Sequence, residues 1–534
     1  MAEMQTPTAA KQRVPAAFPV AFLGSALMVI ALLTAATISP EGFIKATDVA
    51  NRWISHLFGP VYLWFAIITL LMMVGIAVSP LGNIRLGGAD ARPEHGFLSW
   101  FAMLFCAGMG TGFMFWGAAE PLVHYTHPPL VGVESHAARQ TLSLAYTFFH
   151  WGLSPWAIYG MTSIATGFLC FNCRQSFRFS DFLLGSPGDA EQPRKKDTLW
   201  HTLIDFFTLT AIVFGLAATF GMGVLLVEGG LSFVFGFPPS WILKSIVALG
   251  IIGLFWLSSA RGLDKGIKVL SNISMLMCLG LFIFVAIFGS SVNLFAELGN
   301  SIGMYINKLP AMSIGAGEFA EPGWVGEWTI MYWTWWIAWA PFVGVFIALI
   351  SKGRTLRSIT TGVLIVPTLV SCLWFSVMGM AAISLQGTRQ IAGDHFVVTK
   401  AAQVLFQMLG QMPWPEVTSI VSLLIVMIFV SNSADSAIYT LATLTTKKDK
   451  PSLKLQAGWA VLFCTLAMTL VLSGGIVVLR KVTAIAVMPF TVLLSAIFIL
   501  VLVRMLQSCG ILPEETPQAD EESESIQALP NIME

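Results

Sequence analysis

The chain has 534 residues, of which 56% are hydrophobic and 11% are charged. A soluble globular domain usually carries about 25% charged residues, so this composition excludes an ordinary soluble protein and favours a polytopic helical membrane protein. Lys plus Arg and Asp plus Glu each number 29. The chain therefore lacks the excess of basic residues that marks a nucleic-acid-binding surface.

Twelve apolar segments are long enough to cross a bilayer, which takes about 20 residues per helix. We expect them to begin near residues 18, 56, 96, 143, 203, 241, 267, 325, 359, 417, 455 and 483. The first is interpreted as a retained span, because the small residues of a signal-peptide cleavage site do not follow it. The sequence thus predicts an all-α polytopic fold with twelve transmembrane helices.

The basic residues between these segments predict which side faces the cytoplasm. With the N-terminus inside, twenty of the 29 Lys and Arg residues fall in cytoplasmic segments, among them Arg174 and Arg178. This asymmetry follows the positive-inside rule, so both termini are expected in the cytoplasm. Two outer connections, residues 292–309 and 396–409, are long enough for amphipathic surface helices. The acidic tail from residue 513 has too few apolar residues to fold alone and is expected to be disordered.

The third predicted span contains glycines at alternate positions, Gly108, Gly110 and Gly112. Glycine is a poor helix former, and unwound backbone within a bilayer is tolerated only where it lines protein or a cavity. The free N–H groups of such a break can face a carboxylate, and the free C=O groups can face a sodium ion. The alternative is close helix packing through small residues, for which Gly108 and Gly112 suffice without Gly110.

The eighth predicted span carries four tryptophans within seven residues, from Trp333 to Trp339. Tryptophan in membrane proteins is commonly found in the interfacial belt, but four so close together on one helix cannot all reach one interface. At about 100° per residue, Trp335 and Trp339 share a face, and Trp336 and Trp339 form the other adjacent pair. Pro341 lacks an N–H group and is expected to loosen the helix just beyond them.

A second aromatic set, Trp151, Trp156 and Tyr159, lies in the fourth span. Two clusters of aromatic faces suit a quaternary ammonium group, which has no N–H to donate. Such a group is held instead by cation–π attraction, at about 2 kcal/mol or more per contact when desolvated. The two aromatic sets together therefore predict a site for an onium compound.

Ionisable residues are sparse inside the predicted spans. No acidic residue lies in mid-span, and Glu120 and Asp435 lie near span ends, where helix capping or gating is at least as well supported as substrate contact. His150 is expected to be a hydrogen-bonded structural residue rather than a proton relay. We expect no two acid, base or metal-ligand residues to share a face in mid-span, which argues against an enzyme. The spans also lack the continuous polar lining of a channel.

The tenth span ends with Ser-Asn-Ser-Ala-Asp-Ser at residues 431–436. Hydroxyl and amide oxygens beside a broken helix suit a hard cation such as sodium. The alternative is ordinary bonding of these side chains to the carbonyls of their own helix or to a neighbouring helix.

These motifs together resemble one known family. The segments GMGTGFMFWGAAEP (108–121), HWGLSPWAIY (150–159), MYWTWWIAWAPFVGVFIALISKGRTLRS (331–358) and SNSADS (431–436) resemble the betaine/choline/carnitine transporter family. The resemblance covers essentially all spans and implies two inverted five-helix repeats of the leucine-transporter type, alternating access and a homotrimer. The implied divisions are a cytoplasmic tail (1–15), two N-terminal helices (16–95), the first repeat (96–290), an extracellular amphipathic connection (291–324), the second repeat (325–506) and an acidic tail (507–534).

The resemblance also implies a substrate site and sodium sites. The substrate site, with Phe115 as an aromatic gate, is implied at Trp151, Trp156, Tyr159, Trp335, Trp336, Trp339, Gly108, Met109, Gly110 and Phe115. One sodium site is implied at backbone oxygens near Cys106, Met109 and Phe429 and side-chain oxygens of Asn432 and Ser433, and a second at Thr219 and Phe342. Sodium-coupled relatives tend to have Thr where this chain has Asn432, whose carbonyl oxygen can still coordinate the ion.

Departures from relatives narrow the expected function. Gly112 stands where proton-coupled choline members tend to have Asp, and Ser274 and Val343 stand where sodium-independent carnitine exchangers carry Arg and Met. The acidic tail lacks the basic helix of osmosensing relatives. We therefore expect a sodium-coupled symporter of the bacterial inner membrane that imports a betaine-, choline- or carnitine-type onium compound. A sodium-independent carnitine or betaine exchanger is the alternative.

Overall fold

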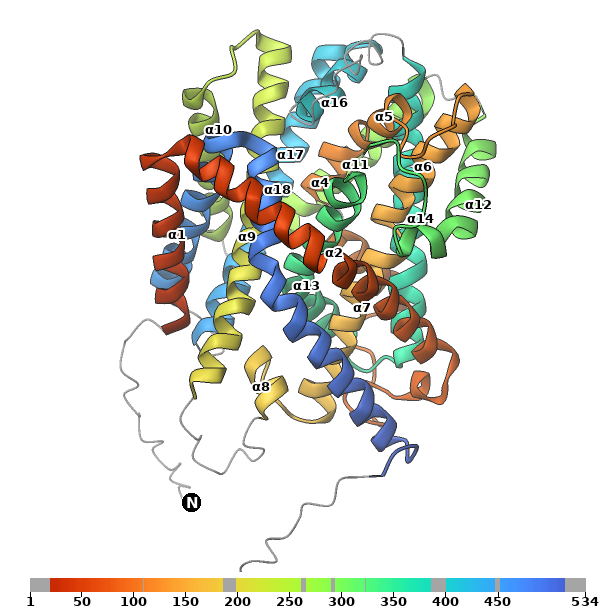
Figure 1. The fold of residues 1–534 in the computed structure, drawn as a ribbon, viewed down its shortest axis with the longest axis vertical. Helices are drawn as coiled ribbons and strands as arrows, with labels where there is room; N and C mark the ends of the chain where they lie inside the picture. Colours follow the sequence, from red (N-terminus) through yellow and green to blue (C-terminus); the bar gives the residue numbers. More distant parts are fainter. Residues whose placement is uncertain are drawn as a thin grey trace, which may run out of the picture.

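The computed structural model describes residues 20–108, 110–185, 198–260, 266–289, 293–321, 323–385, 400–446 and 452–513. Nearly all of this part of the chain is helical (Figure 1). Within these ranges, seven helices are long and apolar enough to cross a membrane, and two shorter apolar segments lie at Trp241–Phe255 and Asn272–Phe288. The predicted helical membrane-protein class is confirmed, whereas the count of twelve spans and the inverted repeat stay predictions.

In the first half of the chain, the third and fourth predicted spans each consist of several shorter helices. The third span becomes α3, α4 and α5, and the fourth becomes α6 and α7, which ends in the π-helical turn η2. The elements in order are α1 (Val20–Ile38), α2 (Pro40–Val78), η1 (Pro80–Asn83), α3 (Phe97–Gly108), α4 (Thr111–Trp116), α5 (Ala119–Thr126), α6 (His136–Trp151), α7 (Leu153–Gly167), η2 (Phe168–Asn172), α8 (Phe179–Leu184), α9 (Leu199–Phe235), α10 (Trp241–Ala260) and α11 (Gly266–Phe288).

The second half contains the two predicted amphipathic connections, which form α12 and, within the described residues, α16. The last two predicted spans form α18, which is interrupted by non-helical backbone at Gly474 and Gly475. Gly475 has φ +61°, a left-handed conformation that glycine adopts without strain. The elements are α12 (Leu294–Ser313), η3 (Gly326–Ile330), α13 (Met331–Ile350), α14 (Leu356–Ser384), α16 (Ala401–Leu409), α17 (Pro415–Thr446) and α18 (Leu453–Ser508).

Two glycines break the helices near the centre of the sequence motifs. Gly110 separates α3 from α4 with extended backbone at φ −146° and ψ −156°, so the break predicted in the third span is confirmed. Gly152 separates α6 from α7 at φ −104° and ψ −129°, and this break was not predicted. A β-carbon at Gly152 would lie 2.9 Å from the Tyr305 hydroxyl, which accepts a hydrogen bond of 3.0 Å from the backbone N–H of Leu153.

The loosening expected beyond Pro341 is wrong, because Pro341 lies inside the continuous helix α13. Close packing on both sides of α13 offsets the hydrogen bond that a proline removes. A β-carbon at Gly344 would lie 2.5 Å from the Thr162 side chain on α7. On the other side, a β-carbon at Gly215 of α9 would lie 2.9 Å from Ala338. The irregular turn precedes α13 instead, in η3.

Segments predicted to be cytoplasmic meet at one end of the helical bundle, the end that carries α8 in Figure 1. The backbone N–H of Gly87 donates to Asn172 Oδ1 at 2.9 Å. The Arg85 guanidinium donates to the carbonyl of Gly353. The loop after α2, the end of α7 and the loop after α13 therefore form one continuous surface.

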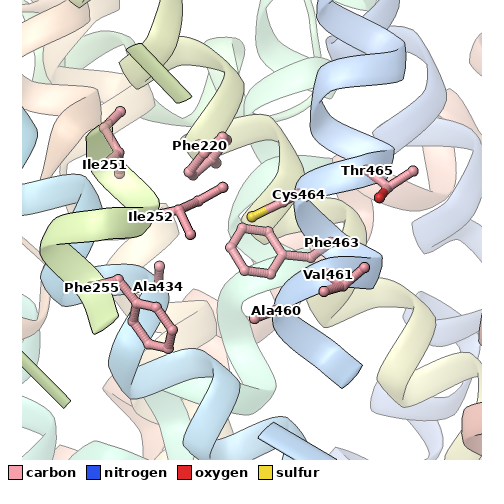
Figure 2. Close-up of a pocket in the computed structure, with 10 residues that line it drawn as sticks. All are labelled: Phe220, Ile251, Ile252, Phe255, Ala434, Ala460, Val461, Phe463, Cys464 and Thr465. Carbon is pink, nitrogen blue, oxygen red and sulfur yellow. The ribbon is translucent and has the colours of Figure 1, made fainter. Parts of the chain in front are cut away.

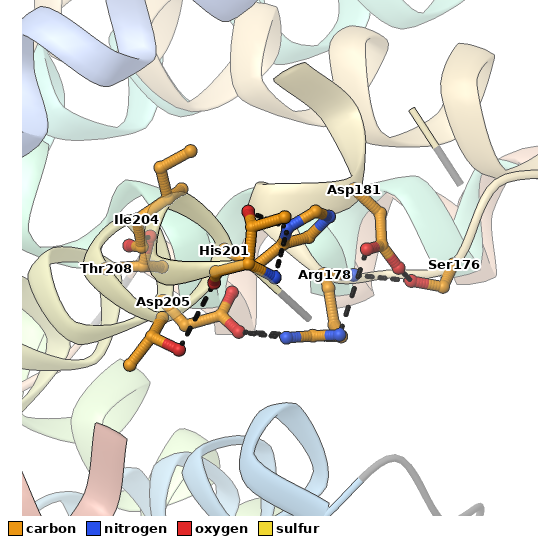
Figure 3. A network of polar contacts seen from close by, with 9 residues as sticks. Ser176, Arg178, Asp181, His201, Ile204, Asp205 and Thr208 are labelled. Carbon is orange, nitrogen blue, oxygen red and sulfur yellow. Dashed lines mark hydrogen bonds and ion pairs between the residues drawn. The ribbon is translucent and has the colours of Figure 1, made fainter. Parts of the chain in front are cut away.

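A largely buried ion-pair network joins the loop before α8 to the first turns of α9 (Figure 3). Arg178 Nε donates to Asp205 Oδ2 at 3.1 Å, and Arg178 Nη1 lies 3.8 Å from Asp181 Oδ1. The Ser176 hydroxyl donates to Asp181 as well. The Arg178 and Asp205 side chains are 8% and 14% exposed, so removal of one charge leaves the other without compensation in a poorly solvated place.

Replacement of Arg178 by alanine is expected to lower the thermal unfolding midpoint of the detergent-purified protein. Removing one partner of a buried pair costs about 3 kcal/mol or more, and both Asp181 and Asp205 lose their cation in this variant. Arg92→Ala, which removes an exposed arginine, is the matched control. Equal midpoints for the two variants in differential scanning fluorimetry would contradict a stabilising role for the network.

Candidate functional site

An aromatic cluster of five side chains lies where α13 packs against α6 and α7. Trp151 and Trp336 have ring centroids 5.1 Å apart and perpendicular planes. Trp336 meets Tyr159 at 5.4 Å, and Tyr159 meets Trp156 at 5.7 Å, both edge to face. Trp335 stacks on Trp336 at 5.7 Å and lies edge-on to Trp151 at 5.8 Å. The structure therefore brings together the two aromatic sets that the sequence placed on separate spans.

Hydrogen bonds to the protein fix the orientation of the indoles at the centre of this cluster. Trp336 Nε1 donates to the carbonyl oxygen of His150 at 3.0 Å, and Trp151 Nε1 donates to Glu120 Oε2 at 2.7 Å. Since both N–H groups are already used, these two indoles can meet a ligand through their faces and edges rather than by hydrogen bonding. This arrangement suits a cation that itself has no hydrogen to donate.

Other predicted substrate residues lie beside the cluster rather than in it. Trp339 Nε1 donates to the carbonyl of Gly215 on α9 at 3.1 Å, and its ring centroid is 5.6 Å from that of Phe342. The Phe115 ring lies 5.0 Å from the Trp116 ring. Trp339 therefore points toward α9, while Phe115 packs against its neighbour Trp116 on α4.

The glycine segment of the third span approaches the cluster from α4. A β-carbon at Gly112 would lie 2.7 Å from Trp335 Cη2 and 2.8 Å from Trp151 Cη2. A side chain at this position would therefore displace one of the two indoles. Gly108 is the last residue of α3 and Gly110 precedes α4, whereas Met109 lies outside the described residues.

The break at Gly110 also lies next to the polar segment of α17. The side-chain atom nearest to a β-carbon at Gly110 would be Ser433 Oγ, at 3.9 Å. Phe429, one turn earlier on α17, is buried, and Asn432 precedes Ser433 on the same helix. Cys106 lies in α3. The structure thus brings Ser433, from the first predicted sodium site, next to the unwound backbone.

The second predicted sodium site is less well assembled. The Thr219 hydroxyl donates to the Gly215 carbonyl at 3.3 Å, and this carbonyl also accepts the hydrogen bond of Trp339. Phe342 packs against Trp339. Thr219 and Phe342 therefore lie near one another through shared neighbours, and a role for them as sodium ligands stays a prediction.

A buried polar network lies directly behind the aromatic cluster, where α5, α6 and α13 meet. Glu120 Oε1 lies 2.7 Å from His150 Nδ1, and the Tyr332 hydroxyl donates to Glu120 Oε2. The side chains of Glu120, His124, His150 and Tyr332 are all fully buried. The expectation that no two acid, base or metal-ligand residues share a face in mid-span did not foresee this group, in which Glu120 and His124 share a face of α5 with His124 Nε2 3.5 Å from Glu120 Oε1. Glu120 and His150 stand on different helices, so the periodicity of one helix cannot show that they meet.

Glu120, His124 and His150 offer ligand atoms within 4.8 Å of one another, a spacing that a metal ion could bridge. However, both oxygens of Glu120 already have hydrogen-bond partners, and His150 Nε2 lies 3.1 Å from Thr329 Oγ1. We therefore interpret the group as a hydrogen-bonded network that holds Trp151 rather than as a metal centre.

Arg480 reaches into the bundle from α18. Its guanidinium lies 5.3 Å from the Trp328 ring and 5.9 Å from the Trp116 ring, and it donates to the backbone carbonyl of Glu327. A small cavity between α4, α9, α13 and α18 has both Arg480 and Trp335 in its wall. This cavity connects the cation to the edge of the aromatic cluster.

A larger cavity, of about 220 Å³, lies between α9, α10, α17 and α18 (Figure 2). Its walls are apolar except for Cys464 and Thr465, and they include Phe220 and Ala434, which directly follow Thr219 and Ser433 in sequence. A charged or zwitterionic ligand would find no compensating group among these lining residues. The aromatic cluster is therefore the better candidate for a polar substrate.

The fold and the site define a multi-pass helical membrane protein with a buried aromatic site suited to a small cation. Residues 20–509 match the family described as BCCT, betaine/carnitine/choline family transporter, and the chain belongs to this family. The chain is therefore a membrane transporter and not an enzyme.

Named relatives cover most of the chain. The glycine betaine transporter OpuD of Bacillus subtilis (strain 168) is 34% identical over 504 residues, which cover 92% of this chain and 95% of that protein. The ectoine/hydroxyectoine transporter of Virgibacillus pantothenticus is 32% identical, with 89% and 93% covered. The osmo-dependent choline transporter BetT2 of Acinetobacter baylyi (strain ATCC 33305 / BD413 / ADP1) is 31% identical, with 96% and 74% covered.

Replacement of Gly112 by alanine is expected to weaken binding of a small onium ligand about tenfold or more, because overpacking of this kind costs about 1–3 kcal/mol. The added methyl group would displace Trp151 or Trp335. Gly75→Ala is the control, since a β-carbon at Gly75 on α2 has no neighbouring atom within 4 Å. Isothermal titration calorimetry of the purified variants checks this, and equal affinities would contradict the close fit of α4 against the cluster.

Proposed function

We propose that this chain is a sodium-coupled symporter that imports a betaine-type zwitterion or related quaternary ammonium compound by alternating access. The aromatic cluster is the observation that carries the proposal, because Trp151 and Trp336 meet at right angles 5.1 Å apart with their N–H groups already engaged. Membership of the transporter family and the betaine, ectoine and choline named for its relatives support the substrate class.

In this proposal the two ends of the substrate are recognised by different elements. The methylated onium lies against Trp151, Trp336 and Tyr159, where cation–π attraction replaces hydrogen bonding. The carboxylate meets the N–H groups that the break at Gly110 leaves without helical partners. The distance between the cluster and the break then decides which onium compounds fit.

Sodium coupling is proposed because oxygen-bearing groups lie near the helix break at Gly110. Ser433 approaches Gly110, and hydroxyl, amide and backbone oxygens are the ligands that a hard cation prefers. Ser274 is neutral and buried, so this position supplies no guanidinium that could replace the sodium charge. A sodium-independent exchanger is the competing function.

The proposal also includes the repeat architecture, the oligomeric state and the membrane orientation that the family resemblance implies. Two inverted five-helix repeats would surround the substrate, and three copies of the chain would form a homotrimer in the bacterial inner membrane. Both termini would lie in the cytoplasm, on the side where Arg85, Arg178 and Arg354 gather, as the positive-inside rule requires.

Replacement of Trp336 by alanine is expected to abolish saturable uptake of glycine betaine into cells, because one wall of the onium site is lost. Protein abundance in the membrane should stay unchanged. Trp64→Ala is the matched control, since Trp64 is 56% exposed on α2. Uptake by Trp336→Ala at the wild-type rate, measured with radiolabelled glycine betaine, would overturn the site assignment.

Replacement of external sodium by potassium is expected to stop accumulation of glycine betaine in proteoliposomes. Ser433→Ala should raise the sodium concentration that gives half-maximal uptake, because one oxygen ligand is removed. Accumulation that persists in potassium, together with counterflow from preloaded vesicles, would instead support the sodium-independent exchanger.

A further inference from the structure

The Glu120 carboxylate lies at the N–H edge of the Trp151 indole. Trp151 Nε1 donates to Glu120 Oε2 at 2.7 Å, and the Glu120 side chain is fully buried. The Trp151 indole therefore contacts both this carboxylate and the aromatic rings of Trp335 and Trp336. A ligand on the face of Trp151 would be separated from the carboxylate by about the width of one ring.

The hydrogen bonds around Glu120 favour its ionised form. Oε2 accepts from the indole N–H of Trp151 and from the hydroxyl of Tyr332, and an indole nitrogen can only donate. His150 Nδ1 can donate to Oε1 while its Nε2 accepts from the hydroxyl of Thr329. An ionised carboxylate with three donors and a neutral imidazole satisfy every one of these contacts.

We propose that Glu120 is the counter-charge of the bound onium and acts through Trp151 as a positioning residue for cationic specificity. The inference rests on the proposed function and deepens it. A hydrogen bond from the indole N–H to a carboxylate increases the electron density of the ring, which strengthens its attraction for a cation. The carboxylate charge also acts directly, since charges interact more strongly in a low-dielectric interior.

The other ionisable side chains near Glu120 come from α5, α6, α13 and α18. His124 Nε2 lies 3.5 Å from Oε1, and His150 and Tyr332 are the donors already described. Arg480 is the cation of α18 on this side, and its guanidinium lies over Trp116 and Trp328. It shares the wall of a small cavity with Trp335, so it reaches the Trp335 edge of the aromatic cluster, whereas Glu120 contacts Trp151 directly.

The test compares glycine betaine with 3,3-dimethylbutanoate, which replaces the quaternary nitrogen by carbon and keeps the shape and the carboxylate. Affinities of the purified full-length protein are measured by isothermal titration calorimetry. In Glu120→Gln, which keeps an acceptor for Trp151 but removes the charge, the preference for glycine betaine over the isostere should fall about tenfold. Binding of 3,3-dimethylbutanoate, a net anion, should stay unchanged or tighten.

Two further variants keep the test decisive. Glu120→Asp retains the charge and should restore most of the preference. Glu228→Gln removes another buried carboxylate, which pairs with Lys244 at 2.9 Å, and should leave the preference unchanged. An equal loss for both ligands in Glu120→Gln would indicate a purely structural role and overturn the inference, as would an unchanged preference. Failure of the wild-type protein to bind glycine betaine would instead overturn the proposed function itself.

Discussion

The structure depends on one constraint, that polar groups inside a membrane-spanning bundle must find their partners within the protein. The indole N–H groups of two cluster residues and of the neighbouring Trp339 meet this constraint in a way that also builds the site, whereas Trp335 Nε1 is buried without a hydrogen-bond partner among the described residues. Trp336 uses the carbonyl of His150, Trp151 uses Glu120, and Trp339 uses the carbonyl of Gly215. Each bond fixes a ring in one orientation, so the satisfaction of buried polar groups and the shape of the site are a single requirement.

His150 shows how closely the hydrogen bonding of buried polar groups and the shape of the site are connected. Its backbone carbonyl holds Trp336 and its imidazole holds Glu120, which in turn holds Trp151. The break at Gly152 directly follows these residues and lets α7 begin in a new direction. Tyr159 on α7 can then meet Trp336, and Trp156 meets Tyr159, an arrangement that an uninterrupted helix through Trp151 would not guarantee.

Much of this arrangement follows from the sequence. The break at Gly110 is predicted by three alternating glycines, and the aromatic composition of the fourth and eighth spans predicts a site for an onium compound. Features that depend on contacts between different helices cannot be predicted from the sequence in this way. Helical periodicity assigns residues to faces of one helix, but Glu120 and His150 belong to different helices. Continuity of α13 across Pro341 likewise depends on how α7 and α9 pack against it.

The walls of the aromatic cluster belong to helices that are interlocked. Gly344 of α13 fits against Thr162 of α7, and the Trp336 bond to His150 ties α13 to α6. A rigid-body motion of these helices would carry the whole cluster without changing its internal geometry. In the proposed cycle the intrinsic affinity for the onium would then be nearly equal on both sides of the membrane. The direction of net transport would then be set by the gradient of the coupled ion, and the approach of Ser433 on α17 to Gly110 is where that ion would act on the cycle.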